Sequence, residues 1–184
     1  METTSLPDAS NLSARRPDEL LTVALGGVII AALRSDRRPL IRGLSEGRFQ
    51  KLLNEFFLDL ELSNGESERT GHAADDDEFN DLVALLLEFR AEPTERGAWL
   101  AYAVASAAMA QNHLWEDMGL PSRKVLSDLM REHFPALAAK NTGDMKWKKF
   151  FYRQLCERAG VPICKSPQCG DCSDYPICFG PEDA

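Results

Sequence analysis

The chain has 184 residues, of which 44% are hydrophobic and 27% charged, and its formal net charge is −8. This length suits one globular domain with tails. The negative charge argues against general nucleic-acid binding and against binding to an anionic membrane surface. The apolar run from Leu20 to Leu33 falls short of the ~20 residues that a membrane span needs. It also starts too late, and with the wrong flanks, for a secretory signal. We therefore expect a cytoplasmic protein.

The first part of the chain predicts a tail and two helices. Residues 1–17 are rich in Ser, Thr, Pro and Asp without periodicity, which predicts a disordered tail. A helix is expected from Asp18 to about Arg34, with acids first and arginine last. Gly26 and Gly27 either weaken this helix or mark close packing. A second helix is expected over residues 45–60, where apolar residues recur at helical spacing: Phe49, Leu52, Leu53, Phe56 and Phe57.

Residues 61–77 are polar and acidic, which predicts an exposed loop. Its last acids, Asp75 to Asp77, are interpreted as a solvated run that leads into the next helix, at about 78–90, rather than as a cation site. A long helix is then expected from Arg96 to about Met118. It is apolar almost all round between Trp99 and Ala110, as is typical of the central, buried helix of a bundle.

Two more helices are expected, at about 122–133 and 142–158. No stretch alternates as a strand would. The sequence therefore predicts an all-α fold: a bundle of five or six helices in residues 18–160, followed by an irregular, cysteine-rich, metal-binding tail in residues 161–184.

Four cysteines crowd this last segment, Cys164, Cys169, Cys172 and Cys178, with the spacing C-x4-C-x2-C-x5-C. The residues between them are mostly turn formers, so something other than a hydrophobic core must order the segment. The first three cysteines, C-x4-C-x2-C, have the spacing of the first three ligands in plant-type [2Fe–2S] ferredoxins. A structural zinc site usually offers two C-x2-C pairs, or one with two histidines, and no histidine follows Cys172. From spacing alone an iron–sulfur group, zinc, and a disulfide or free thiols all stay open.

Further stretches go beyond spacing. They are MKWKKFFYRQLC from Met145 to Cys156, which leads into Cys164–Gly180, then NHLWEDMGL from Asn112 to Leu120, and HFPAL from His133 to Leu137 with Asn141. In these residues the chain resembles the NifQ family of nitrogen-fixation proteins, over roughly Leu44 to Glu182.

The resemblance implies a function in the molybdenum branch of iron–molybdenum cofactor synthesis. NifQ-like proteins are thought to carry a molybdenum–iron–sulfur cluster and to donate molybdenum to the nitrogenase iron protein and the cofactor-assembly scaffold. The expected role is that of a carrier, not an enzyme, with Cys164, Cys169, Cys172 and Cys178 holding the cluster. Three of these cysteines would bind iron, and the fourth, or His113, would contact molybdenum.

Molybdenum reaches cells as molybdate, an oxyanion, which local positive charge attracts. Residues 140–165 carry seven bases and two acids, a net +5. The bases of the last helix are interpreted either as a solvated face opposite an aromatic core stripe or as groups that attract the anion, and the two interpretations are compatible. These bases are Lys146, Lys148, Lys149 and Arg153.

Three other residues are ambiguous. His113 lies three residues before Glu116, so the two could share a helix face and serve a metal, or be structural. His133 is explained by its position at a helix end. Cys156 is either a fifth sulfur ligand or a small buried hydrophobe.

Two other functions compete with the carrier. One is a helical interaction module with a structural zinc site, and the other is a ferredoxin-like electron carrier.

Overall fold

The computed structural model describes residues 19–58, 60–65, 73–161 and 169–182, and within these ranges the chain is helical with no strand. The helices are α1 (Glu19–Arg34), α2 (Glu46–Phe56), α3 (Ala73–Phe89), α4 (Glu95–Ala108), α5 (Leu114–Asp117), α6 (Arg123–His133), α7 (Pro135–Ala138), α8 (Trp147–Ala159) and α9 (Tyr175–Phe179), with a 3-10 turn at Cys169–Asp171. The all-α prediction is confirmed for these residues. None of their helices is long and apolar enough to cross a membrane. The predicted tail at 1–17 lies outside the described residues.

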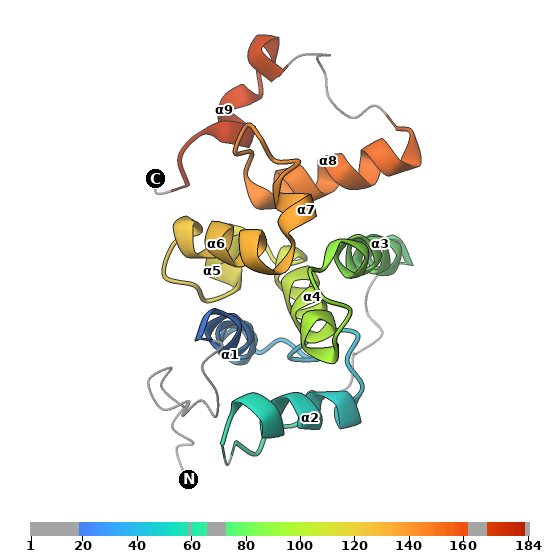
Figure 1. Cartoon of the computed structure of the whole chain (residues 1–184), viewed down its shortest axis with the longest axis vertical. Coiled ribbons are helices and arrows are strands. Elements are labelled where there is room, and N and C mark those ends of the chain that lie inside the picture. The colour runs from blue at the N-terminus through green and yellow to red at the C-terminus, as the bar shows by residue number, and fades with distance from the viewer. Residues whose placement is uncertain (1–18, 59, 66–72, 162–168, 183–184) are drawn as a thin grey trace.

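Helix α4 is the centre of the structure, as its sequence predicts. It packs against α1, α3 and α5 (Figure 1). Nine of its fourteen residues are buried, and Trp99, the largest of them, is 2% exposed. The hydroxyl of Thr94 caps its first turn by accepting the Gly97 N–H at 3.2 Å. Small residues let three neighbours approach this helix, so a chain of modest length builds one continuous core.

The prediction of one long helix that reaches Met118 is wrong in its second half, because α4 ends at Ala108 and a separate helix, α5, begins at Leu114. The break comes from polar tertiary contacts that no periodicity reveals. The Ala110 carbonyl accepts the ammonium of Lys148 at 2.6 Å, and the Asn112 amide donates to Asp117 at 3.0 Å. His113 has an extended backbone and is the N-cap of α5.

The expected exposed loop at 61–77 differs from the structure at both of its ends. Helix α3 already begins at Ala73, so the acidic run lies in its first turns. Asn64 is 1% exposed, and its side chain hydrogen-bonds the backbone of Ile41 and Leu44 at 2.8–2.9 Å. The backbone N–H of Asn64 donates to the Glu46 carboxylate. A hydrogen bond from the Gln50 side chain, together with this one from Asn64, holds the pKa of Glu46 below its usual range. A polar segment can therefore be an internal anchor.

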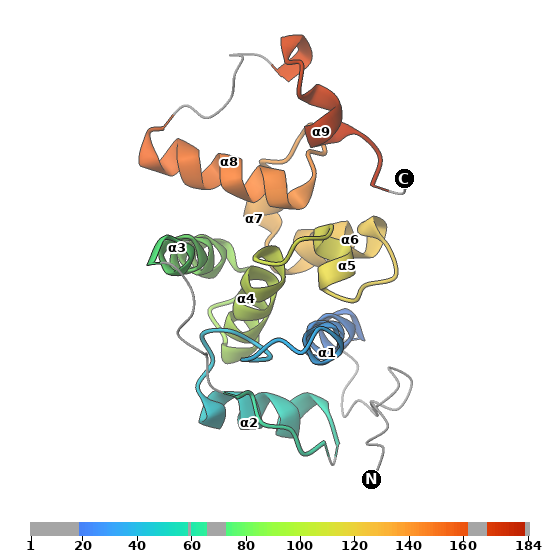
Figure 2. The same ribbon diagram turned by 180° about the vertical axis from the view of Figure 1, so that it is seen from behind.

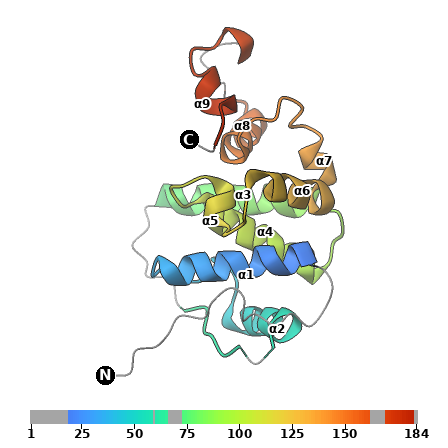
Figure 3. The ribbon, with the colours of Figure 1, turned by 90° about the vertical axis from the view of Figure 1, so that its left-hand side faces the viewer.

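Helix α1 and the end of α5 come into backbone contact. A Cβ at Gly27 would lie 2.2 Å from the Met118 carbonyl oxygen, and Gly119, at φ +63°, faces the Gly27 backbone. Figure 3 shows α1 running alongside the layer that contains α5 and α6. The glycines of α1 therefore mark close packing, one of the two interpretations that the sequence leaves open.

Helix α8 begins at Trp147, five residues later than its predicted start at about 142. The residues before it form a turn that Asn141 closes, through two 2.9 Å side-chain hydrogen bonds with the backbone of Met145. One face of α8 is aromatic and buried, with Trp147, Phe150 and Phe151 no more than 4% exposed. Gly160, at φ +67°, ends the helix as predicted. Figure 2 shows α8 lying across the bundle, with α9 beyond it.

Two glycine substitutions test the contact between α1 and α5. We expect Gly27→Ala to destabilise the protein by about 2 kcal/mol, because the new methyl group overlaps backbone that cannot rotate away. The matched variant is Gly47→Ala in α2, where a Cβ meets nothing within 4 Å. That variant is expected to stabilise the protein by about 0.5 kcal/mol through lower unfolded-state entropy. Urea unfolding measures both, and equal effects of the two variants would contradict the close approach.

Candidate metal centre

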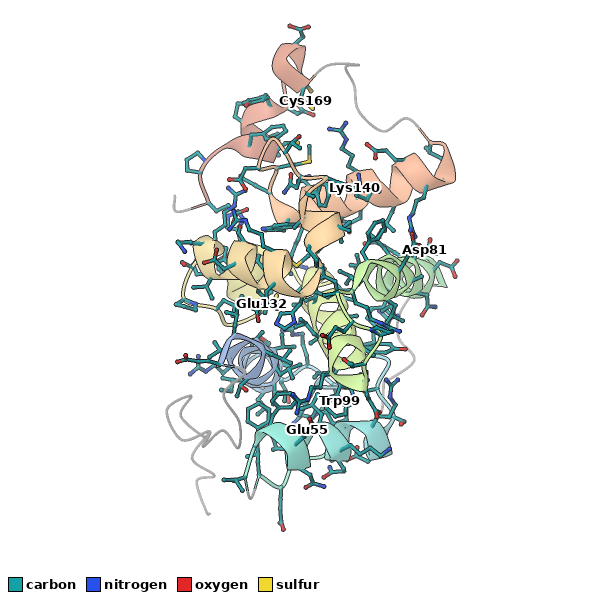
Figure 4. All side chains as sticks on the ribbon, viewed as in Figure 1. Glu55, Asp81, Trp99, Glu132, Lys140 and Cys169 are labelled. Atoms are coloured by element: carbon teal, nitrogen blue, oxygen red, sulfur yellow. The ribbon has the colours of Figure 1, made fainter. Side chains whose placement is uncertain are left out.

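The cysteine-rich segment lies at one end of the molecule, beyond α8, and Figure 4 labels Cys169 at the end opposite Glu55 of α2. Cys169 begins the 3-10 turn, Cys172 follows it, and Cys178 lies in α9. The Cys172 N–H donates to the Cys169 carbonyl at 3.2 Å, and the Tyr175 N–H donates to the Cys172 carbonyl at 3.0 Å. This tight turn follows from the two-residue spacing. Cys164 lies outside the described residues.

The donor types fit a thiolate-bound metal group, but the described residues alone do not assemble one. Cys156, Cys169, Cys172 and Cys178 are each partly buried, and among the described cysteines no disulfide forms. No three His, Cys, Asp or Glu side chains in the described part of the chain meet at a point that would hold a metal ion. Soft thiolates favour iron–sulfur groups and zinc over hard cations.

Arg153 is directed at the cysteine segment. Its guanidinium donates to the Sγ of Cys169 at 3.5 Å and pairs with Glu157, one turn further along α8, at 2.8 Å. A donor at this position stabilises negative charge on sulfur. Arg153 therefore differs from the three lysines with which it is grouped by sequence, because one of its described partners is a thiol.

The segment is fastened to the start of α8. The Lys146 N–H donates to the Cys178 carbonyl at 2.8 Å. Next to it, the rings of Tyr175 and Phe179 stack with centroids 4.5 Å apart. The hydrogen bond joins the last cysteine to the first residue of the basic face, so the backbone of the cysteine segment lies against the start of α8.

A cavity of about 540 Å³ opens beside this junction. Its wall includes Lys146, Lys148 and Lys149 of the α8 N-terminus, His113 before α5, and Ile177 and Glu182 of the C-terminal segment. The structure thus brings together three of the four bases singled out in the sequence, and adds His113.

Lys148 forms an internal ion pair. Its ammonium lies 2.6 Å from Asp117, whose side chain is 5% exposed, and also donates to the Ala110 carbonyl. Asn112 donates to the other Asp117 oxygen. Periodicity places Lys148 on a solvated face, so its structural role comes only from tertiary contact.

His113 and Glu116 do not share a helix face. As the N-cap of α5, His113 donates its backbone N–H to the Glu116 carboxylate at 2.9 Å. Its ring Nδ1 lies 3.9 Å from Glu182. His133 is the last residue of α6, the helix end at which the sequence predicts it. Cys156 lies on α8, three residues after Arg153.

Two carboxylates near this site are missed by sequence reasoning. Asp117 lies inside the Asn112–Leu120 stretch that resembles the family, but the sequence does not indicate that its side chain is buried. Glu182 is 8% exposed although it lies near the C-terminus, and it faces Arg123 at 3.9 Å. No pattern in the sequence signals the burial of Glu182.

The fold and these residues define a helical protein that ends in a thiol-rich segment bordered by basic side chains. The model of the NifQ family matches residues 24–180. The chain belongs to the NifQ family, which places it among nitrogen-fixation proteins.

Three relatives show the extent of the similarity. The chain is 38% identical to the NifQ protein of Rhodobacter capsulatus over 165 residues, covering 86% of this chain and 89% of the relative. It is 45% identical to NifQ of Azotobacter vinelandii over 106 residues, 58% of this chain and 54% of that protein. A NifQ homolog of Sinorhizobium fredii is 36% identical over 138 residues, 75% of this chain and 60% of its own length. The match thus spans about half of the Azotobacter protein and most of the Rhodobacter one. No solved structure matches the chain.

Replacing Lys148 tests the internal ion pair. We expect Lys148→Met to destabilise the protein by about 3 kcal/mol, because it leaves the Asp117 carboxylate buried without its cation. Lys149→Met removes the same charge from an exposed position and is expected to change the free energy of unfolding by less than about 0.5 kcal/mol. Chemical denaturation measures both values. Similar values for the two variants would show that Lys148 is a surface lysine.

Proposed function

We propose that this protein carries a molybdenum–iron–sulfur cluster on Cys164, Cys169, Cys172 and Cys178 and donates molybdenum for assembly of the nitrogenase iron–molybdenum cofactor. The observation that carries the proposal is the thiol-rich segment, with Cys169, Cys172 and Cys178 partly buried at one end of the molecule, in a chain of the NifQ family. Four thiolates at one place repel each other, and metal binding is what offsets this repulsion and orders such a segment.

The proposed role is that of a carrier because donation needs access rather than a general base or nucleophile. The cysteine segment lies at one end of the molecule, where a partner can reach it (Figure 1). Tyr175 and Ile177, beside the cysteines, are 45% and 54% exposed. The cluster is then a cargo, and the partners are the nitrogenase iron protein and the cofactor-assembly scaffold.

Metal analysis of cysteine variants tests the proposal. Wild-type protein isolated without oxygen from molybdate-supplied cells is expected to be brown and to contain iron, sulfide and molybdenum. Cys172→Ala is expected to lose iron and molybdenum together, because both depend on one set of thiolates. Cys156→Ala is the matched control: it removes a thiol of α8 and is expected to retain both metals.

Each alternative gives a different result in the same experiment. A structural zinc site predicts colourless, air-stable protein with zinc and no iron. A ferredoxin-like carrier predicts iron and reversible one-electron reduction without molybdenum, even after growth on molybdate. Either result contradicts the proposal, as does full retention of iron and molybdenum in Cys172→Ala.

Arg153 is expected to stabilise the loaded segment through its contact with Cys169. Loss of a group that hydrogen-bonds a metal ligand typically lowers metal affinity about tenfold or more. Arg153→Met is therefore expected to lose iron to a chelator about tenfold faster than wild type, whereas Arg131→Met, which removes an exposed charge from α6, leaves the rate unchanged. Equal rates for the wild type and Arg153→Met would exclude a role for Arg153 at the thiols.

A further inference from the structure

The cavity between the α8 N-terminus, the residues before α5 and the C-terminal segment has a feature that a solvated basic face lacks: its basic groups converge. Lys146, Lys148 and Lys149 border one space of about 540 Å³. The first turn of α8 has no side-chain cap. The positive end of the helix dipole therefore adds to the lysines at this place.

Some of the charged side chains in the cavity wall already have a partner of opposite charge or a hydrogen bond, and others do not. Lys148 is neutralised by Asp117, and the Glu116 carboxylate accepts the backbone N–H of His113. Within the part of the chain that the structure describes, the ammonium groups of Lys146 and Lys149 form no ion pair. Two cations of the wall are thus available to a ligand.

Glu182 shows that this place accommodates negative charge. Its side chain is 4% exposed, and its carboxylate oxygens lie 3.9 Å from His113 Nδ1 and from Arg123 Nε. The Arg123 Nε is buried without a hydrogen-bond partner among the described residues. Both distances are longer than a direct hydrogen bond, so these contacts hold the Glu182 carboxylate only weakly.

The cavity adjoins the cysteines. Ile177 forms part of its wall and directly precedes Cys178, and the backbone N–H of Lys146 donates to the Cys178 carbonyl at 2.8 Å. An anion bound between Lys146 and Lys149 therefore lies beside the backbone of the cysteine segment.

We propose that this cavity reversibly binds a tetrahedral oxyanion, molybdate, with Lys146 and Lys149 as the direct cationic contacts, and that the Glu182 carboxylate in the same wall opposes its binding through charge repulsion. The inference rests on the proposed function, since it names the form in which molybdenum reaches the cysteine segment. It concerns binding alone.

The test is equilibrium dialysis of metal-free protein against molybdate, with bound molybdenum measured by elemental analysis. Lys146→Met/Lys149→Met is expected to bind molybdate at least tenfold more weakly, because two charge-assisted contacts are lost. Glu182→Gln is expected to bind it several-fold more tightly, since the repelling charge is removed. Lys51→Met/Lys124→Met is the charge-matched control, at two exposed sites outside the cavity, and is expected to bind as wild type does. Thermal unfolding establishes that each variant is folded.

Tungstate, which has the same shape and charge, is expected to compete with molybdate at similar concentrations. Equal binding by wild type and the Lys146/Lys149 variant would overturn the site, as would weaker binding by Glu182→Gln. Equal competition by sulfate would overturn the assignment to molybdate. Absence of binding to metal-free wild type would also overturn the inference, while the iron and molybdenum content of the anaerobically isolated protein tests the carrier function separately. Cys172→Ala is expected to bind molybdate normally while lacking iron, so the two proposals fail independently.

Discussion

The ion pair between Lys148 and Asp117 fixes how α8 lies on the rest of the molecule, and the cysteine segment follows α8. Burying two charges is costly, and their attraction offsets this cost only when the remaining polar groups are also paired. Here Asn112 and the Ala110 carbonyl complete the hydrogen bonding. Burial of Trp147, Phe150 and Phe151 supplies most of the stabilisation of the contact, at about 2 kcal/mol or more for each ring. The ion pair adds specificity to this packing, because Lys148 lies next to Asp117 in only one register of α8.

Further contacts hold the other parts of α8 in this register. Arg158 pairs with Glu88 and the Tyr152 hydroxyl with Glu78, which join α8 to α3. The Trp147 indole N–H donates to the Ser127 hydroxyl of α6 at 3.1 Å. With the aromatic face buried, the opposite face presents Arg153 to Cys169, while Lys146 at the helix start binds the Cys178 backbone. One amphipathic helix therefore connects the core to the thiols.

Local charge matters more than net charge in this protein. The chain carries −8 overall, yet residues 140–165 carry +5, and Arg153 of α8 contacts the Cys169 sulfur. Charges separated by more than about 8–10 Å are largely screened at physiological salt. Neighbouring charges therefore determine the potential at the thiols and in the adjacent cavity, and the acids on distant helices have little effect. Both proposals depend on the basic residues near the cysteine segment.

The amino-acid sequence by itself determined the helical class, the buried character of Trp99–Ala108, the end of α8 at Gly160, the cysteine spacing and the family, because these depend on local periodicity, turn residues and specific short stretches. Tertiary structure decided the rest. The break after Ala108 and the burial of Asn64 arise from hydrogen bonds to residues 38 and 23 positions away in the chain. Lys148 is held in an internal ion pair and Lys149 is exposed, because among the described residues only Lys148 of the two lies next to an acid of another helix, Asp117 of α5. Local pattern carries no information on such partners, since long-range contacts form only when the helices pack.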